Sequence, residues 1–89
     1  MNLNEEQLHE VESMAELFFS PHEIAANLEV DADDFLAILQ TENGPIYQAF
    51  TRGQLQTKMK LRDSILQAAL NGSSPAQQMM REYENKAKP

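Results

Sequence analysis

Three carboxylates at the start of the segment 31–41 have the spacing that comes closest to a chemical site. Asp31, Asp33 and Asp34 lie within one turn of a predicted helix, and clustered carboxylates serve as an acid and base pair or bind a hard cation. The segment lacks the Gly turn and the distal Glu of a calcium loop. Negative charge at a helix N-terminus is favourable by ~0.3 to 1 kcal/mol, so capping explains Asp31 and Asp34.

Other nucleophiles and metal ligands are scarce in this sequence. It contains no cysteine, which excludes disulfides, thiolate metal sites and thiol nucleophiles. His9 has no second histidine at metal-ligand spacing and is expected to lie in solvent. Ser20 and Ser74 each precede a proline at a predicted helix start, where a hydroxyl caps the helix. With no Gly-rich phosphate loop either, we predict a protein that is not an enzyme and that uses no metal or cofactor.

The basic side chains are confined to the second half of the chain. Residues 1–51 contain eleven acids and neither Lys nor Arg, whereas residues 52–89 contain seven bases and three acids, a net charge of +4. Because Lys and Arg neutralise phosphates, these bases are the candidates for DNA contact. They are Arg52, Lys58, Lys60 and Arg62, supplemented by Arg81, Lys86 and Lys88. The alternative is that they are solvated or pair with the acidic half of a neighbouring molecule.

Three helix starts occur in the first half of the chain. Each has a capping residue followed three positions later by a side chain that can bond back, and these pairs are Asn4 and Gln7, Ser20 and Glu23, and Asp31 and Asp34. We expect the second helix to end near residue 28 and the third near residue 41. The expected buried stripe of the first helix is Leu8, Val11, Ala15 and Phe18.

Residues 20–39 predict a helix-turn-helix, in which two short helices cross at a steep angle with Ala25 at their closest approach. The outward positions of its second helix are expected to be Ala32, Asp33, Leu36, Ala37 and Gln40. Gln40 alone is a conventional hydrogen-bond donor to bases or phosphates, so it is a predicted DNA contact. Asp33, Leu36 and Ala37 form the alternative surface, which suits a protein partner.

A long helix is predicted from residue 46 to about residue 70, and Gly53 within it is expected to permit a close helix crossing. Ser74 is expected to cap a last, antiparallel helix, with Met59, Met79 and Met80 packed inside the resulting hairpin. The predicted fold is therefore all-α with five helices. It forms a single domain, 1–89, in which a tri-helical helix-turn-helix head (1–44) precedes a helical hairpin (45–89).

Five motifs follow one another along the chain. They are Leu3-Asn-Glu-Glu-Gln7, Pro21-His-Glu-Ile-Ala-Ala-Asn-Leu28 with Val30-Asp31, Ile46-Tyr-Gln-Ala-Phe-Thr-Arg-Gly53, Leu61-Arg-Asp-Ser-Ile-Leu-Gln-Ala-Ala69 and Gly72-Ser-Ser-Pro-Ala76. In this order they resemble the N-terminal region of bacteriophage terminase small subunits and related phage helix-turn-helix proteins. The resemblance implies a non-enzymatic, ring-forming protein that recognises viral DNA and works with a large ATPase and nuclease subunit. Glu29 stands where that family usually has Gly, and Glu tolerates a positive φ poorly, so we expect an altered turn.

The net charge of −7 and the apolar pattern limit the partners and the location that we expect. The first residues lack the features of a signal peptide, and no stretch approaches ~20 apolar residues, so we expect a cytoplasmic protein of a bacterial host cell with no membrane partner. Two functions are open. One is DNA binding in viral DNA packaging, with double-stranded DNA, further copies of the chain and a large terminase subunit as partners. The other is an acidic interaction or oligomerisation module that keeps the helix-turn-helix fold without binding DNA.

Overall fold

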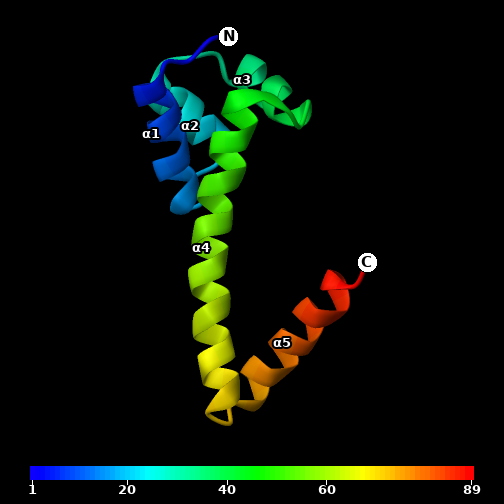
Figure 1. Ribbon diagram of the computed structural model, residues 1–89. Helices are drawn as coiled ribbons and strands as arrows, with labels where there is room; N and C mark the ends of the chain where they lie inside the picture. Colours follow the sequence, from blue (N-terminus) through cyan, green and yellow to red (C-terminus); the bar gives the residue numbers. More distant parts are fainter. The chain divides into compact units, whose positions relative to one another are not determined.

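A computed structural model describes all 89 residues as five α-helices without strands, which confirms the all-α prediction. The helices are α1 (Glu5–Glu16), α2 (Pro21–Leu28), α3 (Ala32–Gln40), α4 (Gly44–Leu70) and α5 (Ser74–Ala87) (Figure 1). The chain divides into two compact units, the head unit (Met1–Thr57) and the hairpin unit (Lys58–Pro89), and α4 contributes to both. None of the five helices has the combined length and apolar character needed to cross a membrane.

Reciprocal hydrogen bonds fix the starts of α1 and α2. The side chain of Asn4 accepts the backbone N–H of Gln7 at 2.8 Å, and the Gln7 side chain accepts that of Asn4 at 2.9 Å. Ser20 and Glu23 form the same pair at 3.2 and 2.9 Å. The bonds from the backbone and hydroxyl of Ser20 lower the pKa of the Glu23 carboxyl. Both capping boxes satisfy N–H groups that a helix leaves free at its first turn, as predicted.

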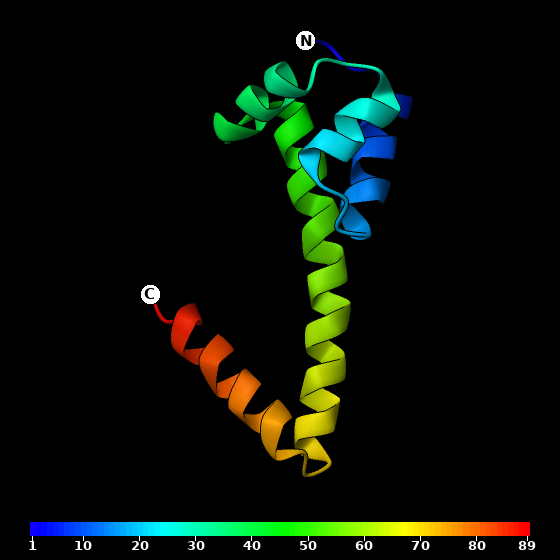
Figure 2. The ribbon, with the colours of Figure 1, turned by 180° about the vertical axis from the view of Figure 1, so that it is seen from behind.

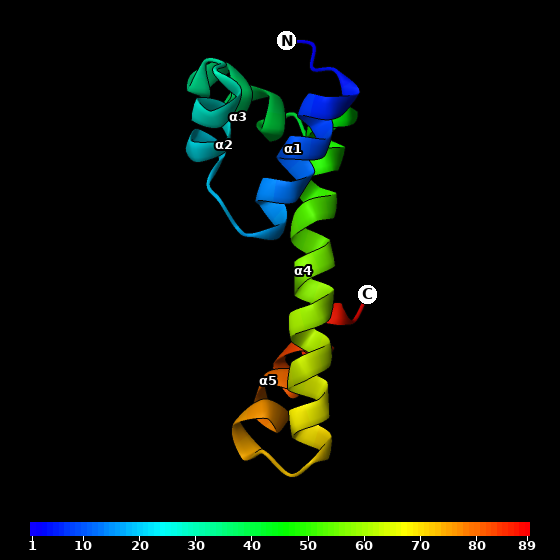
Figure 3. The same ribbon diagram turned by 90° about the vertical axis from the view of Figure 1, so that its left-hand side faces the viewer.

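The core of the head unit joins side chains from its four helical segments. Its buried residues are Val11, Ile24, Ala25, Phe35, Leu39 and Ile46. Figures 2 and 3 show α1, α2 and α3 grouped around the N-terminal part of α4. Ile46, near the start of α4, is part of this core, and the compact head unit extends to Thr57.

Gly53 brings α4 and α1 into backbone contact, which confirms the predicted close crossing. A Cβ at this position would lie 2.8 Å from the Cβ of Ala15 and would also meet the carbonyl oxygen of Glu12. One turn further along α4, the Thr57 hydroxyl donates a hydrogen bond to the carbonyl oxygen of Glu16. Two adjacent turns of α4 are thus held against the C-terminal half of α1.

Three helix ends share one turn geometry, in which an N–H bonds back across five residues. These bonds join Phe19 to Met14 at 3.2 Å, Val30 to Ala25 at 3.0 Å, and Ser73 to Ala68 at 3.0 Å. The residue before each donor has a positive φ, and these residues are Phe18 (59°), Glu29 (58°) and Gly72 (100°). This arrangement is a Schellman motif, whose left-handed position usually holds Gly.

The structure corrects two expectations about these turns. Glu29 adopts the left-handed conformation that Gly normally supplies, so the turn between α2 and α3 is kept and the expected alteration is wrong. Phe18 was expected in the buried stripe of α1, but α1 ends at Glu16 and Phe18 is 46% exposed. Its positive φ takes it off the periodic face of the helix, whereas Val11 and Ala15 are buried as predicted.

The hairpin unit is a pair of helix segments joined by a tight turn. In Figures 1 and 2, α5 runs back from this turn and diverges from the end of α4. Ala69 and Ala76 are buried beside the turn, and Gln77 Nε2 donates to the carbonyl oxygen of Ala69 at 3.0 Å. The cap of α5 is Ser73 rather than the predicted Ser74, because the turn places the Ser73 hydroxyl 3.4 Å from the N–H of Ala76.

The methionines of the hairpin unit differ from their predicted packing. Met80 is half-buried, but Met59 is 72% exposed and Met79 is 41% exposed. The expectation that all three fill the hairpin is therefore wrong for Met59 and Met79. The buried side chains of this helix pair, Ala69 and Ala76, lie beside the turn, and α5 diverges from α4 beyond them.

Candidate nucleic-acid interface

The second helix of the helix-turn-helix presents a surface without positive charge. Asp33, Ala37 and Gln40 are exposed and Leu36 is half-buried, as the sequence predicts for the outward face of α3. Asp31 Oδ1 accepts the N–H of Asp34 at 2.9 Å, while the predicted return bond from Asp34 is not formed. Gln40 is the one side chain of this outward face that can donate hydrogen bonds to a nucleic acid.

The four basic residues predicted to contact DNA are all exposed, and they do not form one patch. Arg52 belongs to the head unit, whereas Lys58, Lys60 and Arg62 belong to the hairpin unit. Lys58 and Arg62 are four residues apart on α4 and share a face, while Lys60 lies two residues from each and faces another way. The structure therefore brings Lys58 and Arg62 together and separates Lys60 from them.

Arg62 is held by an aromatic ring from α5. Its guanidinium carbon lies 4.1 Å from the centroid of the Tyr83 ring, which is the geometry of a cation–π interaction. A stacked guanidinium keeps its N–H groups in its own plane, where they remain available to bind a phosphate. Tyr83 thus orients Arg62 without neutralising its charge.

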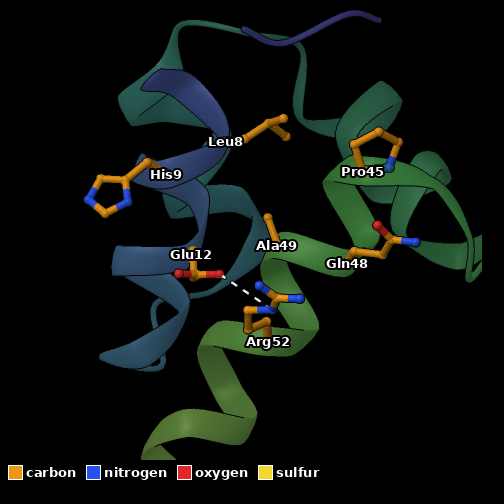
Figure 4. Close-up of a pocket in the computed structure, with 7 residues that line it drawn as sticks. All are labelled: Leu8, His9, Glu12, Pro45, Gln48, Ala49 and Arg52. Atoms are coloured by element: carbon orange, nitrogen blue, oxygen red, sulfur yellow. Dashed lines mark ion pairs between the residues drawn. The ribbon is translucent and has the colours of Figure 1, made fainter. Parts of the chain in front are cut away.

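Arg52 contributes instead to a pocket of the head unit. Its Nε lies 4.0 Å from a carboxylate oxygen of Glu12, and both residues line a cavity of about 300 Å³ between α1 and the start of α4. The remaining lining residues are Leu8, His9, Pro45, Gln48 and Ala49. Figure 4 shows Glu12 reaching towards Arg52, with the His9 ring directed away from both. The Arg52 side chain is 71% exposed, so solvent screens its pairing with Glu12. Arg52 is the single base of the acidic head unit, which makes it the weakest of the four candidates for phosphate contact.

The charge of the molecule follows the division into units. The head unit carries eleven acids and Arg52 as its single base, a net charge of −10, and the hairpin unit carries six bases and three acids, a net charge of +3. No three His, Cys, Asp or Glu side chains are grouped so as to hold a metal ion. A polyanion is therefore attracted to the hairpin unit and repelled by the head unit.

No protein-family model, curated protein or solved structure matches this chain.

Two features of this surface are not evident in the sequence. Arg62 and Tyr83 are far apart along the chain, and only the reversal between α4 and α5 brings them together. The cavity beside Arg52 depends on how α4 approaches α1. The one local signal for that approach is Gly53, a glycine in the middle of a helical pattern.

Proposed function

We propose that this chain is a non-enzymatic helix-turn-helix protein that binds double-stranded DNA in viral DNA packaging, in the manner of a terminase small subunit. The observation that carries the proposal is the pair of exposed cations Lys58 and Arg62 on one face of the positively charged hairpin unit. These residues supply phosphate contacts, which provide sequence-independent affinity. Gln40, on α3 of the head unit, is a separate candidate for hydrogen bonding to a base edge.

Several copies acting together provide the affinity that one small patch lacks. Two or three phosphate contacts per chain bind weakly, and an acidic head unit opposes them. Linked copies make each further contact effectively intramolecular, which raises the overall affinity without new contacts. A large terminase subunit with ATPase and nuclease activity is the protein partner that this role requires.

Fluorescence anisotropy with a labelled duplex of about 30 base pairs, a length that spans several phosphate contacts per strand, tests this proposal. At ~50 mM salt we expect Lys58→Glu to weaken binding ~10-fold or more, and to reduce the salt dependence by about one released counterion. Lys60→Glu has the same change of charge on another face, and we expect a loss of less than ~3-fold. Equal losses for the two variants would place the contact elsewhere, and absence of binding at tens of micromolar protein would refute DNA binding.

A second candidate function is supported by the outward face of α3. Asp33 and Ala37 are exposed beside the half-buried Leu36, and no base lies among them. Such a surface suits a positively charged protein partner better than it suits DNA. If this candidate holds, Asp33→Lys abolishes binding of the partner, for which the large terminase subunit is the first to be tested by calorimetry. Two results together exclude this second candidate. They are loss of DNA affinity in Lys58→Glu and unchanged affinity of Asp33→Lys for the partner protein.

A further inference from the structure

The turn between α1 and α2 exposes three consecutive large apolar side chains. Leu17 is 73% exposed, Phe18 46% and Phe19 37%, and we refer to them as the Leu17–Phe19 patch. Single exposed apolar residues are ordinary on a protein surface, whereas a contiguous group marks an interaction site. The patch is part of the acidic head unit, and Glu16 directly precedes it.

Phe18 is exposed in spite of an unfavourable backbone. It occupies the left-handed position of the Schellman motif with φ 59°, a conformation that is strained for a bulky residue and unstrained for Gly. Neither the fold of the turn nor solubility explains an aromatic side chain there. Glu29 and Glu42 have the same conformation, with φ 58° and 54°, so the feature that marks Phe18 for binding is its exposed ring between two exposed apolar neighbours.

A complementary apolar face lies on α4 in the hairpin unit. Met59, Leu66 and Leu70 follow one another at seven and four residues, a spacing that places them on one side of the helix. Met59 and Leu70 are each 72% exposed, and Leu66 is also exposed. Lys58 and Arg62 flank this face. We refer to the three residues as the Met59–Leu70 face.

Charge decides how these two surfaces pair between molecules. Two head units, each with a net charge of −10, repel one another, and two hairpin units, each with +3, also repel. A head unit and a hairpin unit attract. We propose that the Leu17–Phe19 patch of one copy docks onto the Met59–Leu70 face of a second copy, with acids of the head unit facing bases of the hairpin unit.

This contact is heterologous, because each copy uses its Leu17–Phe19 patch to bind one neighbour and its Met59–Leu70 face to bind another. Each docked molecule leaves one of its surfaces free for the next copy, so assembly continues to a closed ring or an open filament. The inference deepens the proposed function, since it supplies the linked copies on which DNA affinity depends and uses bases of the same hairpin unit. Its test is made without nucleic acid, so a failure to assemble is distinguished from a failure to bind DNA, which the anisotropy measurement reports separately.

Sedimentation of the full chain at about 100 μM, where micromolar affinities are saturated, gives the first test. We expect species larger than a dimer that dissociate with added salt. Phe18→Gly removes the central side chain and gives the strained position to the residue that favours it, so the variant folds at least as stably as the parent while its assembly is lost. Glu29→Gly relieves the same backbone strain in the next turn and is expected to assemble normally. Asp33→Lys, which changes the outward face of α3, is also expected to assemble.

A mixing experiment distinguishes the heterologous contact from a symmetric one. Leu70→Ser replaces an exposed side chain, so the hairpin unit keeps its fold while the receiving face is damaged. Alone, Phe18→Gly and Leu70→Ser are each expected to be monomeric. Mixed in equal amounts, they retain one intact patch and one intact face between them and are expected to form a dimer and nothing larger. The proposal is overturned by a monomeric parent chain, by assembly of Phe18→Gly alone, or by a mixture that stays monomeric.

Discussion

Gly53 of α4 lies directly against Ala15 of α1, so the side chain between the two helices at this point is that of Ala15. The Cβ of Ala15 is 2.8 Å from where a Gly53 Cβ would be, and the carbonyl of Glu12 is also in the way. Ala15 is fully buried. The absence of a side chain at Gly53 therefore allows α4 to approach the backbone of α1 at this point.

Gly53→Ala is expected to destabilise the chain by about 1–3 kcal/mol, the usual cost of forcing extra atoms into a packed site. Ala favours a helix interior over Gly by about 1 kcal/mol, so the sign of the effect distinguishes packing from helix propensity. Urea denaturation monitored by circular dichroism measures it. Gln48→Ala, at an exposed position of the same helix, is the control and is expected to stay within about 0.5 kcal/mol. A stabilised Gly53→Ala variant would mean that α1 and α4 do not touch here.

Glu29→Gly is expected to raise the stability of the head unit, because Gly adopts φ 58° without the steric cost that Glu incurs. A gain of about 1 kcal/mol corresponds to a rise in Tm of roughly 4–8 °C for a chain of this size. Gly72→Ala is the inverse substitution at a matched turn and is expected to lose a similar amount. Thermal unfolding of the two variants beside the parent chain measures both effects. A lower Tm for Glu29→Gly would contradict the left-handed geometry of that turn.

The carboxylate of Glu23 is expected to make folding depend on pH. Its pKa is lowered from 4.5 by the bonds from Ser20, so its stabilising effect is complete above the unfolded value and is lost as pH falls through the lower folded pKa. Glu23→Gln removes this acid-dependent part of the stability and keeps the ability to cap. Ser20→Ala removes the hydroxyl and keeps the backbone N–H, the larger cause of the lowered Glu23 pKa, so NMR titration is expected to show that pKa rising only part of the way towards 4.5, at a cost in stability of about 1 kcal/mol. A Glu23 pKa in the parent chain that is not lowered from 4.5 would disprove the capping box.

Tyr83→Leu is expected to destabilise the hairpin unit by about 0.5–1 kcal/mol through loss of the cation–π interaction with Arg62. Tyr83→Phe keeps the ring and is expected to lose much less. Tyr83→Leu removes the ring that orients Arg62, whereas Tyr83→Phe keeps it. We therefore also expect Tyr83→Leu to weaken DNA binding more than Tyr83→Phe does. Urea denaturation and DNA anisotropy on the same samples check both effects. Equal behaviour of the Leu and Phe variants would show that the ring does not hold Arg62.

The helix starts could be predicted from the sequence because capping is local. Asn4 and Ser20 bond to backbone groups only three residues away, so four-residue patterns contain the whole interaction. The α5 cap was misplaced by one residue since Ser73 and Ser74 both qualify, and the choice depends on the bond that Ser73 makes to Ala68 across the turn. The core position of Val11 followed from helical periodicity in the same way.

The features that the sequence did not predict depend on non-local geometry. Phe18 continues the apolar period of α1, and the start of the next helix at Ser20 and Pro21 requires α1 to end before Ser20 without fixing its end at Glu16. The positions of Met59 on α4 and of Met79 on α5 are the same whether the hairpin is closed or open. Their exposure therefore depends on how far α5 diverges from α4. Which bases share a face was readable from spacing, but the contact of Arg62 with Tyr83 required the folded hairpin.

The opposite charges of the head and hairpin units have a practical consequence for handling this protein. A sequence pI of about 4.6 suggests simple acidic behaviour, yet the chain has the character of a zwitterion, with separate regions of each sign. Molecules of this type attract one another at low ionic strength and separate as added ions screen that attraction. The protein should therefore salt in, so that its solubility is lowest in dilute buffer and rises with moderate sodium chloride, and it should be retained by anion and cation exchangers alike.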